Sequence, residues 1–502
     1  MIWHIFKKDL QLVWPFALLA AVVHGLNATA VYFSVGIDRW YASATVLSVL
    51  SILGLIVLIV SVVHQDTVPG VRQDWLIRPI RRRDLIAAKL LFVLVMGLGP
   101  LYAADVALGL ADKFPLGATL AASLMRSAAL LCLICLPTLI GAAVTHTLQE
   151  FVVISAMAAV ASWVLGVLLA TMGVHTPLAG TGLTWITTSV WTGLSVSAAL
   201  TVLPMQYVHR GGSRIRWLSG GFLVCTFLAI LIPWKLAFAI QTSLSPEPGS
   251  GNPVAMEYNS TQPARLFRVT ISLLHPDSAR ILFKLVVKGL PVNSVLVADH
   301  YAVRVLNTQG TILYQGVSNS PKASQPTAGL ALRHGDEEQE QFVADQSIDI
   351  PFHAIAGKSG QAVRVEIDYS LTLMRSVAQD WFASAENDES LAGFGRCSIR
   401  PDGRAVELNC LATHPMSGCI AGYTGQQAAG KRTWLFLDCN SRNYAPLTGA
   451  IWRDAYFRLG FFGTGQRFDN TGDARVPYNM VEMFVPQDHF TRHVTIPKLQ
   501  LP

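Results

Sequence analysis

Charged residues are scarce in this chain of 502 residues, because Asp, Glu, Lys and Arg together make up only 14% of it. Soluble globular proteins carry about 25% charged residues, so this composition excludes an ordinary water-soluble enzyme. It also excludes an intrinsically disordered chain, since disordered segments are rich in charge and poor in apolar residues. Instead, 52% of the residues are hydrophobic. The composition is typical of a membrane protein.

Acidic residues are missing from a long stretch of the first half of the chain. None occurs between Glu150 and Glu247, and residues 1–245 hold 15 basic against 8 acidic residues, which leaves 23 and 24 for the rest. The basic residues of the first half lie mainly in short segments between apolar runs. This distribution is typical of membrane topology and argues against binding to nucleic acid.

Signatures of catalysis and of metal binding are also missing. The sequence contains no HExxH or GxSxG motif, and its 13 histidines lack the spacing of metal ligands. The segment most similar to a P-loop, residues 425–432, has Arg432 where a P-loop has the hydroxyl residue that holds Mg²⁺. We therefore expect a non-catalytic protein with no cofactor and no metal.

Long apolar runs dominate the first half of the chain. A run of about 17–25 apolar residues can cross a bilayer as a helix, with its backbone polar groups satisfied internally. We expect seven such helices within a transmembrane domain of residues 12–242. The predicted spans are residues 12–35, 41–63, 86–109, 118–144, 151–173, 184–206 and 218–240. Residues 1–11 are predicted to form an amphipathic helix along the membrane interface.

The basic residues between these spans predict the orientation of the chain. If the N-terminus is cytoplasmic, the inside segments hold ten Lys and Arg residues, whereas the outside loops hold only Arg39 and Lys113. Basic residues are enriched in cytoplasmic loops, so this bias favours a cytoplasmic N-terminus. Seven is an odd number, and the second half of the chain is therefore expected outside the cytoplasm.

The second half is predicted to form an all-β, sandwich-like extracytoplasmic domain. Residues 243–254, rich in Ser, Pro and Gly, are predicted as a linker to a domain of residues 255–502, with a subdivision near 380. Short alternating or β-branched runs separated by turn residues predict strands there. The expected strands are residues 266–274, 281–287, 294–297, 302–306, 363–373, 433–437, 456–462 and 493–496.

Four of the seven cysteines fall together in this polar half: Cys397, Cys410, Cys419 and Cys439. In an oxidising compartment such a cluster predicts two disulfides, for which the sequence leaves three pairings open. A zinc site is the alternative, although the intervals of 13, 9 and 20 residues contain no CxxC motif.

Two ionisable residues, Asp105 and Arg126, lie in or near the third and fourth predicted spans. Charged groups inside a membrane are costly and often functional. Both residues lie toward the same side of the membrane, so they are candidates for an intramembrane polar pair across neighbouring helices. The alternative is that each side chain reaches separately toward the outer headgroups.

The segment between the second and third spans combines an acidic–aromatic pair, an Arg-Pro turn and an arginine cluster. Its run QDWLIRPIRRRDLIAAKL, residues 73–90, resembles the cytoplasmic loop of ABC-2 type transporter permeases, where a similar W-x-x-R-P-I-x-R-x-x-L-x-x-A-K run joins spans two and three. The resemblance covers about residues 1–206 and includes the interfacial helix and six spans. The plain alternative is that these arginines only set membrane topology.

In that family the loop docks on a separately encoded ATPase subunit. The resemblance therefore implies an ATPase-coupling loop, with four residues at or beside the contact and three that hold the segment at the membrane surface. The first four are Asp74, Trp75, Arg78 and Pro79, and the other three are Arg82, Arg83 and Lys89. Typical members end after the sixth span, whereas this chain continues with a further apolar run and a large polar region.

The resemblance implies a permease subunit of an ABC-2 type exporter in the bacterial inner membrane, with a periplasmic domain. The implied partners are a cytoplasmic ABC ATPase, a second permease as a homodimer or a paired subunit, membrane lipid and a periplasmic protein, but no nucleic acid. The alternative function is a membrane-anchored binding or scaffold protein whose outer β-domain recognises an envelope ligand or protein.

Overall fold

The computed structural model describes most of the chain, which forms two compact units. One unit consists mainly of residues 1–176 and 184–232, and the other mainly of residues 233–443 and 454–502. The described ranges are 1–33, 38–65, 81–145, 147–171, 183–209, 212–269, 278–319, 331–334, 341–352, 355, 360–380, 389–391, 395–402, 405–413, 418–424, 433–440, 452–460 and 478–501.

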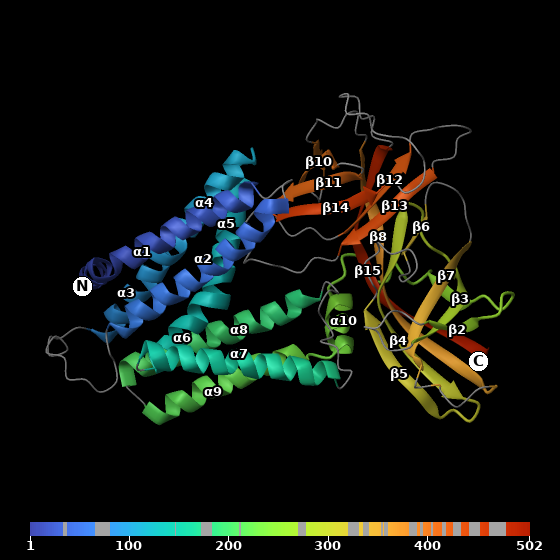
Figure 1. Cartoon of the computed structure of the whole chain (residues 1–502), viewed down its shortest axis with the longest axis horizontal. Helices are drawn as coiled ribbons and strands as arrows, with labels where there is room; N and C mark the ends of the chain where they lie inside the picture. The colour runs from blue at the N-terminus through green and yellow to red at the C-terminus, as the bar shows by residue number, and fades with distance from the viewer. Residues whose placement is uncertain are drawn as a thin grey trace. The chain divides into compact units, whose positions relative to one another are not determined.

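The first unit is helical (Figure 1). Its helices are α1 (Ile2–Phe33), α2 (Asp38–His64), α3 (Arg82–Phe92), α4 (Gly99–Ala111), α5 (Leu116–Leu130), α6 (Leu136–Val144), α7 (Leu148–Thr171), α8 (Thr184–Pro204) and α9 (Gly212–Leu228). Short π-helical turns η2 (Val93–Leu98) and η3 (Leu131–Cys135) join α3 to α4 and α5 to α6, η4 (Met205–His209) extends α8, and a 3-10 turn η5 (Ala229–Leu231) follows α9.

Six helical stretches of the described chain are long and apolar enough to cross a membrane, and each overlaps one of the first six predicted spans. They are Ile2–Ala30, Thr45–His64, Arg83–Ala111, Leu116–Val144, Leu148–Leu165 and Trp185–Tyr207. The predicted interfacial segment 1–11 is not a separate helix, because α1 runs without a break from Ile2 to Phe33. No glycine stops the helix near residue 11, and Pro15 removes only one backbone hydrogen bond.

The predicted seventh span, residues 218–240, is wrong as a single helix. Its first part lies in α9 and η5, which end at Leu231, and Pro233 then caps the start of α10 (Trp234–Ser243). A proline disfavours helical geometry in the residue before it. Ile232 accordingly has φ −56° and ψ 120°, which ends the preceding helix. Helix α10 belongs to the second unit, which therefore begins before the predicted linker 243–254.

The second unit is built from antiparallel strands. The seven-stranded sheet has the order β13 (Thr433–Asn440), β12 (Gly418–Thr424), β15 (Tyr478–Gln500), β8 (Ala362–Asp380), β4 (Ser294–Asn307) and β5 (Ile312–Asn319), with β6 (Ala331–His334) also paired to β4. A four-stranded sheet joins β3 (Ser278–Lys288) to β1 (Ala255–Tyr258), β2 (Arg265–Val269) and β7 (Gln341–Pro351). The other has the order β14 (Trp452–Gly460), β11 (Ala405–Ala412), β10 (Gly395–Asp402) and β9 (Glu389–Leu391).

The core of this unit lies between the seven-stranded sheet and the sheet that contains β3. Every second residue of β8 from Val363 to Leu373 and of β3 from Ala279 to Val287 is buried in one apolar cluster. This period of two is the pattern of strands that face a core on one side. The β-rich region predicted from the sequence is therefore present, with helix α10 added to it.

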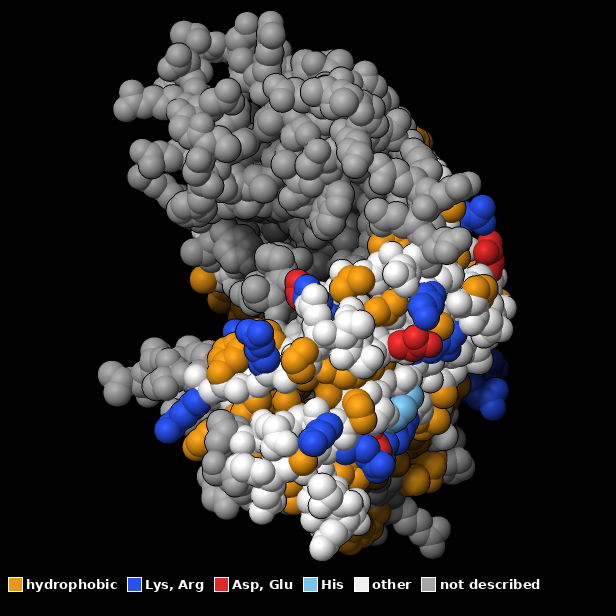
Figure 2. Space-filling view, turned by 90° about the vertical axis from the view of Figure 1, so that its right-hand side faces the viewer, with side chains coloured by type: hydrophobic (Ala, Val, Ile, Leu, Met, Phe, Trp, Pro, Cys, Tyr) orange, Lys and Arg blue, Asp and Glu red, His pale blue; other side chains and the backbone are white. Residues whose placement is uncertain are grey.

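The outward side of the β3 sheet carries charge pairs between neighbouring strands. Arg280 contacts Asp349 at 2.7 Å, and Lys288 contacts Glu257 at 3.0 Å. Basic and acidic side chains are scattered among apolar ones over the described surface in Figure 2. Exposed pairs of this kind each contribute about 0–1 kcal/mol, so they favour solubility and strand register more than stability.

Candidate functional site

The predicted coupling loop is only partly within the described residues. Asp74, Trp75, Arg78 and Pro79 lie outside them, and Arg82 opens α3. The Arg83 side chain is exposed. Lys89 differs from the expectation, because its side chain is only 3% exposed and does not reach a surface.

Lys89 instead joins three helices. Its Nζ atom lies 2.9 Å from Asp9 Oδ2 on α1 and donates a second hydrogen bond, also 2.9 Å long, to the Val62 carbonyl oxygen on α2. The Asp9 side chain is 1% exposed. A buried charge is tolerated only when it is paired and hydrogen-bonded, and this arrangement meets both conditions. We call Asp9, Lys89 and the Val62 carbonyl group the α1–α3 clamp.

Asp9 was not among the residues singled out in the sequence, although a local signal existed. Phe6, Asp9, Val13 and Ala17 are spaced three or four residues apart and are all buried, so that Asp9 interrupts an apolar stripe of α1. Residues at this spacing share one face of a helix. A carboxylate within such a stripe indicates a buried cationic partner.

The structure brings together Asp105 of α4 and Arg126 of α5. The Nη1 atom of Arg126 donates a hydrogen bond to Asp105 Oδ1, and the two side chains are 4% and 7% exposed for Asp105 and Arg126 respectively. The helices approach closely one turn further along, where Gly109 faces Thr119. A Cβ atom on Gly109 would lie only 2.3 Å from the Thr119 Cγ2 atom. Because Gly109 has no side chain, α4 and α5 can pack closely enough for Asp105 and Arg126 to pair.

Polar side chains also join α1 to α2. The Nδ1 atom of His24 is hydrogen-bonded to Ser51 Oγ, and Ser48 Oγ donates to Asn27 Oδ1 at 2.9 Å. Hydrogen bonds of this kind hold neighbouring helices together in an apolar surrounding. Among the described residues, the polar contacts that join helices of the first unit thus include the clamp, the Asp105–Arg126 pair and this α1–α2 contact.

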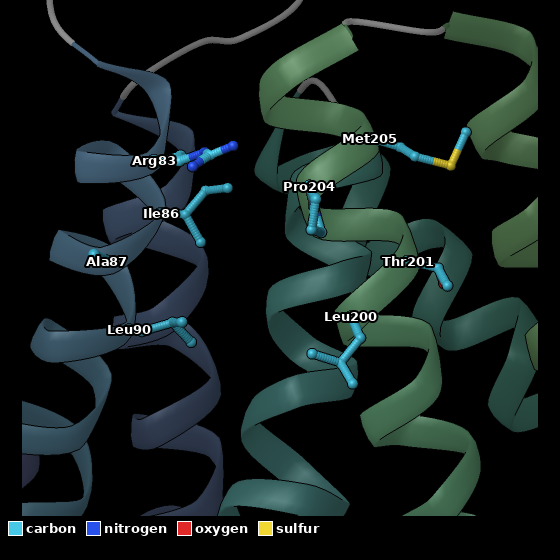
Figure 3. A pocket seen from close by; sticks show the side chains of 8 residues that line it. All are labelled: Arg83, Ile86, Ala87, Leu90, Leu200, Thr201, Pro204 and Met205. Atoms are coloured by element: carbon cyan, nitrogen blue, oxygen red, sulfur yellow. The ribbon is translucent and has the colours of Figure 1, made fainter.

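An apolar cleft of about 660 Å³ opens between α3 and α8 (Figure 3). Its lining residues are Arg83, Ile86, Ala87 and Leu90 from α3, Leu200, Thr201 and Pro204 from α8, and Met205 from η4. Arg83 lies at one end of the cleft, and Leu90 and Leu200 lie at the other. Such a lining accommodates an apolar group, with a cationic side chain at the end nearest to the predicted loop.

A polar cluster in the second unit was missed by the sequence analysis. Two β-bulges surround it, because the pairing of β4 and β15 with the central strand β8 skips Asp299 in β4 and Gln487 in β15. A bulge inserts one extra residue and re-aims the neighbouring side chains, and bulges are frequent beside functional sites. Helix α10 packs on the sheet at this point through Trp234, which stacks on His300 with ring centroids 4.3 Å apart.

A chain of hydrogen bonds runs through this cluster from the sheet to α10. Thr372 Oγ1 donates to Asp299 Oδ2 and lies 2.8 Å from His489 Nδ1, and His489 Nε2 lies 2.8 Å from Gln241 Nε2. A threonine hydroxyl has only one hydrogen, which here goes to Asp299. When Asp299 is ionised, Nδ1 of neutral His489 therefore donates a hydrogen bond to Thr372 Oγ1, and Nε2 accepts one from the Gln241 amide.

Burial shifts the pKa values of this cluster in opposite directions. Desolvation raises the pKa of Asp299 to about 7, although the hydrogen bond from Thr372 opposes the shift. Desolvation lowers the pKa of His489 to about 4, with the Asp488 carboxylate acting in the other direction, and lowers that of His300 to about 4. All three groups thus favour their neutral forms in the folded protein.

These shifts predict that Asp299→Asn makes the protein more sensitive to acid. Between about pH 4 and 7 the folded state holds a proton on Asp299 that the unfolded state has lost, so this group adds stability as the pH falls. His300 and His489 have the opposite effect on stability. Between about pH 4 and 6.5 they bind protons in the unfolded state but not in the folded state, so they lower the stability as the pH falls. Without the carboxyl group, nothing in this cluster offsets the loss of stability that the two histidines cause as the pH falls.

The expected change is an additional loss of up to about 1.4 kcal/mol in the free energy of unfolding per pH unit of acidification, relative to the unaltered chain. Urea unfolding of the full chain in detergent, followed by tryptophan fluorescence at a series of pH values, measures this difference. Parallel pH profiles for the variant and the unaltered chain would contradict the assignment.

The cysteines divide between the two units. Cys132 and Cys135 lie in η3 and Cys225 lies in α9, and all three are free thiols. The four cysteines of the predicted disulfides lie on strands β10, β11, β12 and β13.

Comparison with known proteins adds no family to these observations, because no family model and no curated protein sequence matches the chain.

Proposed function

We propose that this protein is the membrane permease subunit of an ABC-2 type transporter, which exports a substrate with energy from a separately encoded ATPase. The observation that carries the proposal is the α1–α3 clamp. Helix α3 is the first described element after the predicted coupling loop, and Lys89 fastens it to Asp9 of α1 and to the Val62 carbonyl group of α2. A movement of the loop would therefore be transmitted through α3 to α1 and α2.

The strength of this connection follows from burial. Removing one partner of a buried ion pair costs about 3–5 kcal/mol, so the three helices resist being pulled apart. Helices that are joined in this way move as a rigid body when one of them is pushed. ATP-driven closure of an ATPase dimer would push the loop, and α1, α2 and α3 would then move together relative to the rest of the unit. Two permease subunits, identical or paired, would surround one pathway.

The proposed location is a bacterial inner membrane, with a cytoplasmic N-terminus and the β-rich unit outside. The six long apolar helices support a multi-pass membrane protein. We assign the seventh crossing to α9 and η5, whose apolar part begins at Trp217 and is shorter than the six long helices. A short apolar segment can cross where the bilayer thins around it. Arg214 and Arg216 at its start match the excess of basic residues on the cytoplasmic side.

Charge reversal in the loop tests the proposal. The double variant Arg78→Glu with Arg82→Glu is expected to abolish co-purification with a co-expressed ABC ATPase of the same genome, because arginine anchors commonly dominate such contacts. The measurement is the amount of ATPase that remains bound to the tagged, detergent-solubilised permease, together with its ATP hydrolysis.

The matched control is Arg210→Glu with Arg214→Glu. It also reverses two positive charges on the predicted cytoplasmic side of the membrane, but outside the loop, and is expected to retain the complex. Unchanged binding and ATP hydrolysis in the loop variant would contradict the permease assignment. That outcome would favour a membrane-anchored binding protein instead.

A further inference from the structure

The strand register places the four clustered cysteines directly opposite one another in two pairs. In the pairing of β10 with β11, Cys397 is opposite Cys410, and in the pairing of β12 with β13, Cys419 is opposite Cys439. Both pairings are antiparallel. The polar half of the chain contains no other cysteine, so all four of its thiol residues are accounted for by these two positions.

Opposite residues in antiparallel strands are at a suitable distance for a disulfide. Their Cα atoms are about 4.5 or 5.5 Å apart, depending on whether the pair is hydrogen-bonded. Disulfides bridge Cα atoms about 4.4–6.8 Å apart, so the spacing of directly opposite residues is within the range of a disulfide for both pairs.

The register also separates the three pairings that the sequence leaves open. Strands β10 and β11 belong to a four-stranded sheet, whereas β12 and β13 belong to the seven-stranded sheet. Either alternative pairing would therefore join cysteines from two different sheets. Only one of the three pairings joins hydrogen-bonded neighbours in both bridges.

We propose that the mature protein contains two cross-strand disulfides, Cys397–Cys410 and Cys419–Cys439, formed in an oxidising compartment. For each bridge, two thiols lose two protons and two electrons as the S–S bond forms. The acceptor is the disulfide of a protein thiol oxidant, which becomes a dithiol by exchange. The three free cysteines of the helical unit take no part. This inference does not rest on the ATPase partner, because it needs only that the β-rich unit lies outside the cytoplasm.

The bridges would fix the register of the two hairpins. A shift of one residue between paired strands would move the side chains to the other face of the sheet, and a covalent cross-link between opposite residues prevents this. Strand β12 connects β13 to the long strand β15, so a fixed β12–β13 register also holds the end of the seven-stranded sheet. Structural disulfides of extracytoplasmic proteins commonly have this role.

The test is thiol alkylation of the full chain, purified in detergent without reductant and denatured in the presence of the alkylating reagent so that buried Cys135 reacts, followed by proteolysis and mass spectrometry. We expect three cysteines to be alkylated before reduction and all seven after it, with cross-linked peptides that contain Cys397 with Cys410 and Cys419 with Cys439. Peptides that join cysteines across the two hairpins would overturn the pairing, and alkylation of all seven without reductant would overturn the disulfides.

Single variants give a second readout of the pairing. Cys397→Ser is expected to free only Cys410 for alkylation, and Cys439→Ser is expected to free only Cys419. Stoichiometric zinc in the purified chain, lost when the thiols are alkylated, would overturn the proposal in favour of a metal site. Failure of ATPase binding in the charge-reversal experiment leaves these outcomes unchanged, so the two proposals fail separately.

Discussion

Replacing Arg126 by methionine while Asp105 stays in place is expected to lower the free energy of unfolding of the helical unit by about 3–5 kcal/mol. Both side chains are less than a tenth exposed, and the guanidinium group donates directly to the carboxylate. The variant would leave a negative charge on Asp105 in a buried surrounding without its guanidinium partner. Unfolding in mixed detergent micelles, followed by circular dichroism, measures the loss.

A double-mutant cycle separates the charge from the packing. Asp105→Leu combined with Arg126→Met removes both charges and is expected to recover most of the lost stability, because apolar side chains of similar volume often replace buried ion pairs without cost. The control is Arg81→Met, an exposed arginine before α3, which is expected to change stability by less than about 0.5 kcal/mol. A double variant as unstable as the single one would contradict the role of the ion pair.

The sequence was informative about this pair because charges inside apolar runs are rare. Asp105 and Arg126 stand out in two successive spans near the same side of the membrane, so their proximity could be inferred from the order of the spans alone. The Asp9–Lys89 contact could not be inferred in this way. Both residues lie near the ends of helices, where a charged side chain ordinarily reaches toward the membrane surface. Only the packing of α1 against α3 determines that Lys89 turns inward.

The seventh span shows where hydropathy misleads. The apolar run continues across residue 233, yet the local chemistry of Pro233 ends one helix and begins the next. The residues after Pro233 then join the β-rich unit, in which Trp234 donates a hydrogen bond to Ser370. A hydropathy window averages over such a break, whereas the proline at residue 233 indicates that a helix ends there.

The polar cluster beneath α10 was hidden because its members are far apart in the chain. Asp299 and His300 interrupt an apolar alternation, so β4 was predicted as two short strands, residues 294–297 and 302–306, instead of one. In the structure the bulge at Asp299 lets the strand continue. The partners that satisfy these polar groups come from α10, β8 and β15, and no local pattern indicates them.

Breaking the α1–α3 clamp is expected to uncouple the proposed transporter while leaving its ATPase bound. Lys89→Met alone should lower the free energy of unfolding by about 3–5 kcal/mol, because Asp9 would remain buried without its ammonium partner. The informative variant is therefore Asp9→Leu with Lys89→Met, which removes both charges and is expected to restore most of the lost stability, less the contribution of the hydrogen bond to the Val62 carbonyl oxygen. It keeps the predicted loop residues 74–79 intact, so the ATPase should still co-purify.

In this double variant α3 has lost its ionic connection to α1, and we expect ATP to move α3 without moving α1. Spin labels at Leu12 of α1 and Leu200 of α8, both exposed, report the distance between these helices after the three free cysteines are replaced by serine. With the clamp intact, ATP is expected to change this distance in the complex. In the double variant the distance should stay at its nucleotide-free value while ATP hydrolysis continues. The charge-swapped chain, Asp9→Lys with Lys89→Asp, restores the ionic contact between α1 and α3 but not the hydrogen bond to the Val62 carbonyl oxygen, and is the control that should recover part of the ATP-driven change. An equal change of distance with and without the clamp would show that force from the loop reaches α1 by another route.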